Sequence, residues 1–141
     1  MTYKLLLVDD EVHILRATEF KLARAGFDVV CASDGMEAWE SMQEVCPDMV
    51  VTDLNMPRMD GLKLVQKMRA DERFENIPVI MLTAKGYEVA NEVIRDEYRV
   101  AHVMTKPFSP RELLALVQSL LSSAEETAAE LATTATPAGK E

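Results

Sequence analysis

Short apolar runs recur along the chain and form the clearest pattern in its sequence. Each run is four to six residues long, is mostly apolar without strict alternation, and stops at a polar or turn-forming residue. Runs of this kind are typical of strands that are buried on both faces of a sheet. They predict five strands, at Lys4–Val8, Phe27–Ala32, Met49–Thr52, Pro78–Leu82 and Ala101–Met104.

The stretches after these runs carry apolar residues at helical spacing. They predict five helices, at Val12–Ala25, Met36–Val45, about Leu62–Ala70, Tyr87–Asp96 and Pro110–Leu121. The apolar stripe of the first helix is imperfect and consists of Val12, Leu15, Phe20, Leu22 and Ala23, with Gly26 as the stop. Asp34 and Glu37 have capping-box spacing at the start of the second helix. Ser109 and Glu112 have the same spacing at the start of the last.

Strand and helix segments alternate five times along the chain. Right-handed crossovers between parallel strands leave few arrangements other than a parallel sheet with helices on both faces. We therefore expect one doubly wound, five-stranded α/β domain over residues 1–121. Residues 122–141 are rich in Ala, Ser, Thr and Glu and lack the apolar residues of a core, which predicts a partly helical or disordered tail.

The composition is that of an ordinary globular protein, with 48% apolar and 28% charged residues among 141. The net charge of −9 argues against direct binding to nucleic acid or to an anionic membrane, because both require a basic surface. The chain has neither an apolar run of membrane-spanning length nor a cleavable signal, so we expect a cytoplasmic address. Cys31 and Cys46 lack metal-ligand spacing and are expected to be reduced, largely buried thiols.

Polar side chains stand where four of the predicted strands end. They are Asp9 and Asp10 after the first strand, Asp53 after the third, Thr83 after the fourth and Lys106 after the fifth. Each alone is more often a helix cap, a loop hydroxyl or a surface cation. The carboxyl ends of parallel strands, however, meet at one edge of the sheet, where ligands bind in α/β folds.

Taken together, these side chains indicate phosphoryl chemistry. Three neighbouring carboxylates repel one another unless a cation neutralises them, and Mg²⁺ is held by one or two carboxylates with water and phosphate oxygens. A lysine charge and a threonine hydroxyl would complete a phosphoryl clamp around a carboxylate nucleophile. Asp53 would then become an aspartyl phosphate.

Four motifs in this order resemble the receiver domain of two-component response regulators, over Thr2 to about Leu121. They are LLLVDDE, VVTDLNMPRMDG, VIMLTA and MTKPF. The resemblance implies a flavodoxin-like fold with strand order 2-1-3-4-5. It also implies a signalling module that receives a phosphoryl group from a histidine kinase or a phosphotransfer protein. Such a module is no enzyme beyond its own phosphorylation and dephosphorylation.

The resemblance also implies a role for each matching residue. Asp53 becomes the phosphoryl acceptor, which Thr83 and Lys106 assist at the phosphoryl oxygens. The Mg²⁺ site takes Asp9 through water, Asp10, Asp53 and the backbone carbonyl of Asn55. A cis peptide bond is expected between Lys106 and Pro107.

The chain departs from the family pattern at the output position. Val103 stands where relatives usually have an aromatic residue that rotates inward on activation. His102 lies beside it, but alternation along a strand points it to the opposite face. Phosphorylation is expected to change the surface of the fourth helix, the fifth strand and the fifth helix. The tail is too short for a DNA-binding domain, so we expect an unknown downstream protein partner and a monomer or weak dimer.

Two other functions are compatible with parts of this pattern. A magnesium-dependent phosphohydrolase would share the acid and the metal, but it needs a second Asp two residues after the nucleophile, where Asn55 stands. A phosphorylation-independent adaptor would keep only the receiver fold. The intact set of Asp10, Asp53, Thr83 and Lys106 argues against the adaptor.

Overall fold

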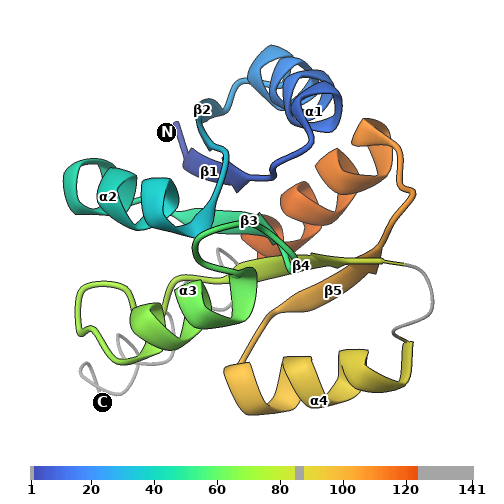
Figure 1. The fold of residues 1–141 in the computed structure, drawn as a ribbon. Coiled ribbons are helices and arrows are strands. Elements are labelled where there is room, and N and C mark those ends of the chain that lie inside the picture. The colour runs from blue at the N-terminus through green and yellow to red at the C-terminus, as the bar shows by residue number, and fades with distance from the viewer. Residues whose placement is uncertain (1, 85–87, 124–141) are drawn as a thin grey trace, which may run out of the picture. The chain divides into compact units, whose positions relative to one another are not determined.

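The computed structural model describes residues 2–84 and 88–123, without the side chains of residues 88–91. The described residues divide into two compact units, one up to Phe108 and one from Ser109 onward. The first unit contains an alternating series of strands and helices (Figure 1). Its elements are β1 (Lys4–Val8), α1 (Val12–Arg24), β2 (Asp28–Ala32), α2 (Gly35–Val45), β3 (Met49–Asp53), α3 (Gly61–Arg69), β4 (Val79–Thr83), α4 (Glu88–Tyr98) and β5 (His102–Thr105).

The five strands form one parallel sheet in the order β2-β1-β3-β4-β5. The predicted α/β class and strand order are therefore confirmed. β1 ends at Val8 as predicted, whereas β3, β4 and β5 each extend one residue further than predicted. Asp53 is the last residue of β3, in register with Leu82, and Thr83 is the last residue of β4, in register with Thr105. Ladder pairing thus continues into the polar residues and fixes their backbones.

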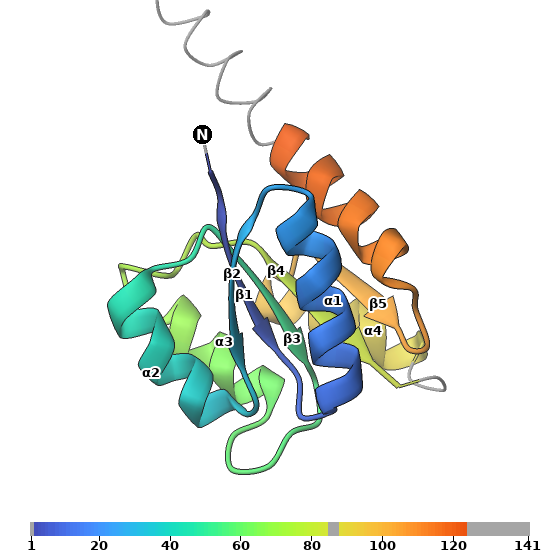
Figure 2. The ribbon, with the colours of Figure 1, turned by 90° about the horizontal axis from the view of Figure 1, so that it is seen from above.

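Helices pack on opposite faces of this sheet (Figure 2). One face carries α2, α3 and α4, whose apolar side chains share a core cluster with alternate strand residues. The strand members of that cluster are Leu6, Val8, Ala32, Val50, Val79 and Met81, and the helix members include Ala38, Met42, Leu64, Val65, Met68 and Ile94. The helix α1 lies on the other face, against β1 and β2. Burial on both faces explains why the strands read as continuous apolar runs.

The predicted apolar stripe of α1 is wrong at three positions, Val12, Phe20 and Ala23, all of which are exposed. Val12 and Phe20 are 60% and 63% exposed, whereas Leu15, Thr18 and Leu22 are buried. At 100° per residue, Phe20 lies about 140° around the helix from Leu15 and so cannot share its face. The guanidinium of Arg24 instead stacks over the exposed Phe20 ring, 5.5 Å from its centroid.

The helix ends follow the sequence signals closely. Asp34 caps α2 by accepting a hydrogen bond from the Glu37 N–H at 2.8 Å, and Gly26 follows α1 with φ of 102°. The side chain of Glu37 accepts from the N–H of Ser33, one residue before the cap. Cys46 ends α2 in a left-handed conformation and is exposed, so the prediction that both thiols are largely buried is wrong for it.

Arg69, at the end of α3, ties three segments together. Its guanidinium donates to the carbonyls of Glu75 and Ile77, at 3.0 and 2.9 Å. It also donates to those of Tyr98 and Arg99 at the end of α4, at 3.2 and 2.9 Å. Burial lowers the pKa of Arg69, with the charge of Arg99 adding to the effect. The bonds to Tyr98 and Arg99 satisfy carbonyls that the end of α4 leaves without intrahelical partners.

In the second unit, residues 110–123 are helical. The Ser109 hydroxyl accepts from the Glu112 N–H at 3.1 Å, as expected for a cap. The predicted tail, residues 122–141, lies outside the described residues from 124 onward, and its boundary stays a prediction. In the part of the chain that the structure describes, no helix combines the length and apolar character needed to span a membrane.

Candidate phosphoryl and metal site

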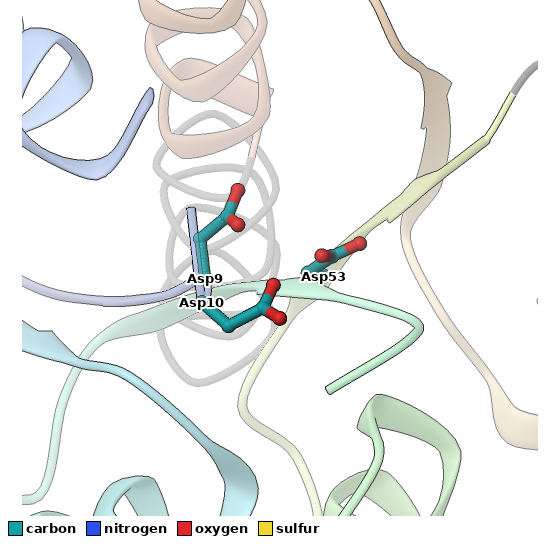
Figure 3. A group of neighbouring side chains, drawn as sticks. All are labelled: Asp9, Asp10 and Asp53. Carbon is teal, nitrogen blue, oxygen red and sulfur yellow. The ribbon is translucent and has the colours of Figure 1, made fainter. Parts of the chain in front are cut away.

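The carboxyl edge of the sheet brings the predicted site residues together. Asp9 and Asp10 follow β1, Asp53 and Thr83 end β3 and β4, and Lys106 follows β5. Oxygens of Asp9, Asp10 and Asp53 lie within 4.8 Å of one another. Figure 3 shows the three side chains beside one another, Asp9 and Asp10 at adjacent positions and Asp53 next to them. Asp9 and Asp53 are 3% and 7% exposed, while Asp10 is open to solvent.

Lys106 supplies the positive charge at this edge. Its Nζ lies 3.0 Å from Oδ2 of Asp9 and 3.2 Å from Oδ2 of Asp53. Its backbone N–H donates to the Thr83 carbonyl at 2.7 Å, which holds the start of the loop beside β4. The peptide bond between Lys106 and Pro107 is cis, as the resemblance implied.

A third acid, Glu11, also contacts this lysine. Its Oε1 lies 2.7 Å from Nζ of Lys106, and it is the longest side chain of the Asp9-Asp10-Glu11 run. Sequence reasoning did not select Glu11 as a site residue. The available signal was that three consecutive acids follow a strand whose end belongs to the site.

Burial and charge change the proton affinities of the site. Burial raises the pKa of Asp53 to about 6, with the charge of Lys106 opposing this and those of Asp9 and Asp10 adding to it. Burial also raises the pKa of Asp9. For Lys106, burial alone would lower the pKa, but its contacts with Glu11 and Asp9 and the charge of Asp53 raise it overall. Lys106 therefore stays charged. The carboxylates lie close enough to repel one another, which favours their protonated forms.

The donors present fit a hard divalent cation. Oδ1 of Asp9 accepts from the Glu11 N–H at 2.9 Å. Its Oδ2 is buried and contacts Lys106 as an ion pair, but it has no hydrogen-bond partner. A nearby cation stabilises a carboxylate oxygen in this position, because burial removes the water that would otherwise hydrogen-bond to the oxygen. Three carboxylates with one solvent-facing side match the mixed carboxylate and water ligation of Mg²⁺.

Thr83 and Asn55 occupy different surroundings. Thr83 is fully buried at the end of β4, two strands from Asp9. Asn55 is exposed in the loop after β3, and its carbonyl remains a predicted metal ligand.

Gly61 allows α3 to begin directly against the end of β3. A Cβ at Gly61 would lie 2.4 Å from the backbone oxygen of Asp53. The Gly61 N–H donates to the Leu54 carbonyl at 2.9 Å, which closes the loop of residues 54–60. The Asp60-Gly61 pair of the motif thus supplies both the α3 cap, through the Lys63 N–H at 2.8 Å, and the close approach.

The chain is similar to known proteins over most of its length. Residues 5–118 match the family model described as "Response regulator receiver domain". The chain is 39% identical over 125 residues to the alkaline phosphatase synthesis transcriptional regulatory protein PhoP of Bacillus subtilis, covering 89% of this chain and 51% of that protein. It is 43% identical over 122 residues to the probable transcriptional regulator ycf27 of Cyanophora paradoxa, covering 86% and 49%.

Among solved structures, the chemotaxis response regulator CheY4 of Vibrio cholerae superposes with a TM-score of 0.76 at 30% identity, covering 84% of this chain and 98% of that one. The chain spans about half the length of the two curated relatives. The chain therefore belongs to the receiver domain family of two-component response regulators.

Proposed function

We propose that this receiver accepts a phosphoryl group on Asp53, in a Mg²⁺-dependent transfer from a histidine kinase or a phosphotransfer protein. The observation that carries the proposal is the convergence of three carboxylates and Lys106 at one edge of the sheet. Family membership supports the same function.

In the proposed transfer, an ionised Oδ atom of Asp53 attacks the phosphorus of a phosphohistidine. The P–N bond breaks, and the imidazole nitrogen keeps the bonding electron pair and takes up a proton. With a pKa of about 6, Asp53 is mostly ionised at neutral pH and can act as the nucleophile. Bound Mg²⁺ would supply charge neutralisation between the carboxylates and the phosphoryl oxygens.

The protein's own residues then hold the product. Lys106, already 3.2 Å from Asp53, would turn its ammonium to a phosphoryl oxygen, and Thr83 would bring its hydroxyl to another. Asp9, Asp10 and the Asn55 carbonyl would remain with the metal. A phosphohydrolase is less well supported, because Asn55 offers no second carboxylate. A phosphorylation-independent adaptor is less well supported, because Asp10, Asp53, Thr83 and Lys106 are all present.

Output is proposed to pass through α4, β5 and the C-terminal helix to a downstream protein. Val103 is half-buried and packs against the core cluster, while His102 is exposed, in agreement with the predicted alternation. Two relatives of about twice the length are named as transcriptional regulators. Three predictions therefore concern this domain alone. They are that it makes no direct contact with nucleic acid, that it is cytoplasmic, and that it is a monomer or weak dimer.

Intact-mass spectrometry tests the acceptor directly. A small phosphodonor such as acetyl phosphate, added with MgCl₂, should add one phosphate to the parent and none to Asp53→Asn. Asp48→Asn is the matched control, because Asp48 immediately precedes β3, at the end opposite Asp53, and is exposed. An undiminished phosphate signal in Asp53→Asn would rule out the assignment.

A further inference from the structure

The loop of residues 54–60 is held to the start of α2 by an ion pair between residues distant in sequence. The guanidinium of Arg58 donates through Nε to Oδ2 of Asp34 at 2.9 Å and through its terminal nitrogen to Oδ1 at 3.2 Å. The Asp34 side chain is 10% exposed, while that of Arg58 is 60% exposed. A two-point contact to a largely buried carboxylate fixes direction as well as distance, unlike most surface ion pairs.

A second contact joins the same two segments. The N–H of Gly35, the first residue of α2, donates to the Met59 carbonyl at 3.1 Å. A Cβ at position 35 would lie 2.4 Å from that carbonyl oxygen, so only glycine permits the approach. The two contacts use adjacent residues on both sides, Asp34 with Arg58 and Gly35 with Met59. The loop therefore rests on the capped end of α2.

The backbone of Arg58 shows what this contact holds in place. Its φ is 66°, in the left-handed region that side chains other than glycine rarely adopt. The other described non-glycine residues with positive φ, Cys46 and Arg99, directly follow α2 and α4, where this conformation commonly ends a helix. Arg58 lies in mid-loop, and an unfavourable conformation there persists only when surrounding contacts hold it.

We propose that Asp34 and Arg58 are positioning residues for the metal site, holding residues 54–60 in the conformation that presents the Asn55 carbonyl beside Asp53. This inference rests on the proposed Mg²⁺ site. The hydrogen bond from Arg58 also holds the pKa of Asp34 below its ordinary value, so the pair is charged at neutral pH. Asp34 and Arg58 touch neither Mg²⁺ nor the phosphoryl group in this scheme and act through the loop backbone.

Two substitutions separate the contact from the helix cap. Asp34→Asn keeps an oxygen for the Glu37 N–H but loses the charge that faces Arg58. Arg58→Lys keeps the charge but loses the planar fork that reaches both oxygens. Asp71→Asn is the matched control, because Asp71 receives a similar two-point contact from Arg73, at 3.0 and 2.7 Å, in the loop after α3.

The first measurement is amide hydrogen exchange of the metal-free proteins, followed at the N–H groups of Met59 and Gly61. Both N–H groups are bonded within the loop, to the Pro57 and Leu54 carbonyls. Asp34→Asn should speed their exchange by roughly threefold to tenfold, the range for losing one hydrogen-bonded contact, and Arg58→Lys by less. Asp71→Asn should leave both rates unchanged.

The second measurement is the dissociation constant for MgCl₂ by titration calorimetry, well below the unfolding temperature. It should rise by roughly threefold to tenfold in Asp34→Asn and stay unchanged in Asp71→Asn. Unchanged Mg²⁺ affinity in both Asp34→Asn and Arg58→Lys would overturn the inference, with or without faster loop exchange. Failure of the parent to bind Mg²⁺ would instead rule out the proposed metal site. Faster loop exchange in the variants would then show only that the contact between Asp34 and Arg58 holds the loop.

Discussion

Nζ of Lys106 lies closer to Oε1 of Glu11, at 2.7 Å, than to Oδ2 of Asp53, at 3.2 Å. The charge that is proposed to bind the phosphoryl group is thus shared among three carboxylates before any phosphoryl group arrives. Glu11 is 57% exposed at its side chain, so it can leave the lysine at small cost in free energy. In the proposed transfer, Glu11 would therefore compete with an incoming phosphoryl group for Lys106 and would also repel its negative charge.

Glu11→Gln should tighten the binding of beryllofluoride, a phosphoryl mimic, because the substitution removes both the competition and the repulsion. We expect a decrease in the dissociation constant of about twofold to fivefold, as for an exposed ion pair. Fluorine NMR titration with MgCl₂ present measures it. Glu19→Gln is the control, since Glu19 pairs with Arg16 on the same helix at 2.8 Å. Weaker binding in Glu11→Gln would contradict the competition.

Asp53→Asn should stabilise the metal-free protein, and the gain should depend on pH. Folding raises the pKa of Asp53 from 3.8 to about 6, so the folded state binds this proton more tightly than the unfolded state. The resulting stability is complete below about pH 4 and is lost as pH rises through about 6.

The neutral Asn side chain avoids that loss. The gain in the free energy of unfolding should reach up to about 3 kcal/mol near pH 8 and vanish near pH 4. Urea denaturation with a chelator present, repeated across this pH range, measures it. A gain that is equally large at pH 4 would show that charge is not its cause.

Lys106→Met should destabilise the metal-free protein, because it leaves Asp9 and Asp53 buried without their cation. We expect a loss of about 2 to 4 kcal/mol near pH 8. MgCl₂ should restore more stability to this variant than it adds to the parent, since one positive charge fewer opposes the metal. Equal increments on adding MgCl₂ in the two proteins would argue that the metal binds away from the lysine.

Gly61→Ala should destabilise the fold by about 1 to 3 kcal/mol, since the added methyl group meets the Asp53 backbone and cannot be accommodated by a rotamer change. Lys63→Ala, on the exposed side of the same helix, should change stability by less than about 0.5 kcal/mol. Denaturant midpoints compare the two variants with the parent. A neutral Gly61→Ala would mean that α3 can shift away from β3 freely.

Val103→Tyr should enlarge the response of α4 and β5 to phosphorylation. Relatives usually place an aromatic ring at this position, and the valine side chain is too short to fill space that Thr83 would vacate on activation. Amide exchange with and without beryllofluoride, in the parent and the variant, measures the response. His102→Tyr is the control, because His102 is exposed on the opposite side of β5. A large response in the parent that Val103→Tyr leaves unaltered would show that the missing ring does not limit the switch.

The parallel sheet made much of the site predictable. Because each buried strand shows as an apolar run, the residues that end the runs must meet at one edge, and Asp9, Asp53 and Lys106 do so. Their mutual distances follow from strand order and register rather than from any local pattern. The cis bond before Pro107 came from the family resemblance alone.

Features that depend on side-chain reach could not be predicted. The contact of Glu11 with Lys106 and that of Arg58 with Asp34 join residues from different loops, and neither leaves a periodic signal. The stripe predicted for α1 wrongly included Phe20, whose angle around the helix places it off the buried face. Its ring contacts Arg24 rather than the sheet.

The four carbonyls bound by Arg69 also constrain how α4 can move. Two of them belong to Tyr98 and Arg99, so α4 is pinned at its C-terminal end to the end of α3. Any displacement of α4 that keeps these bonds is a swing about that pinned end. With a rise of 1.5 Å per residue along its 11 residues, a swing of about 10° carries the far end through roughly 3 Å. Arg69 thus fixes the C-terminal end of α4. The largest displacement in such a swing falls at the N-terminal end of α4, which follows β4 and Thr83 in the chain.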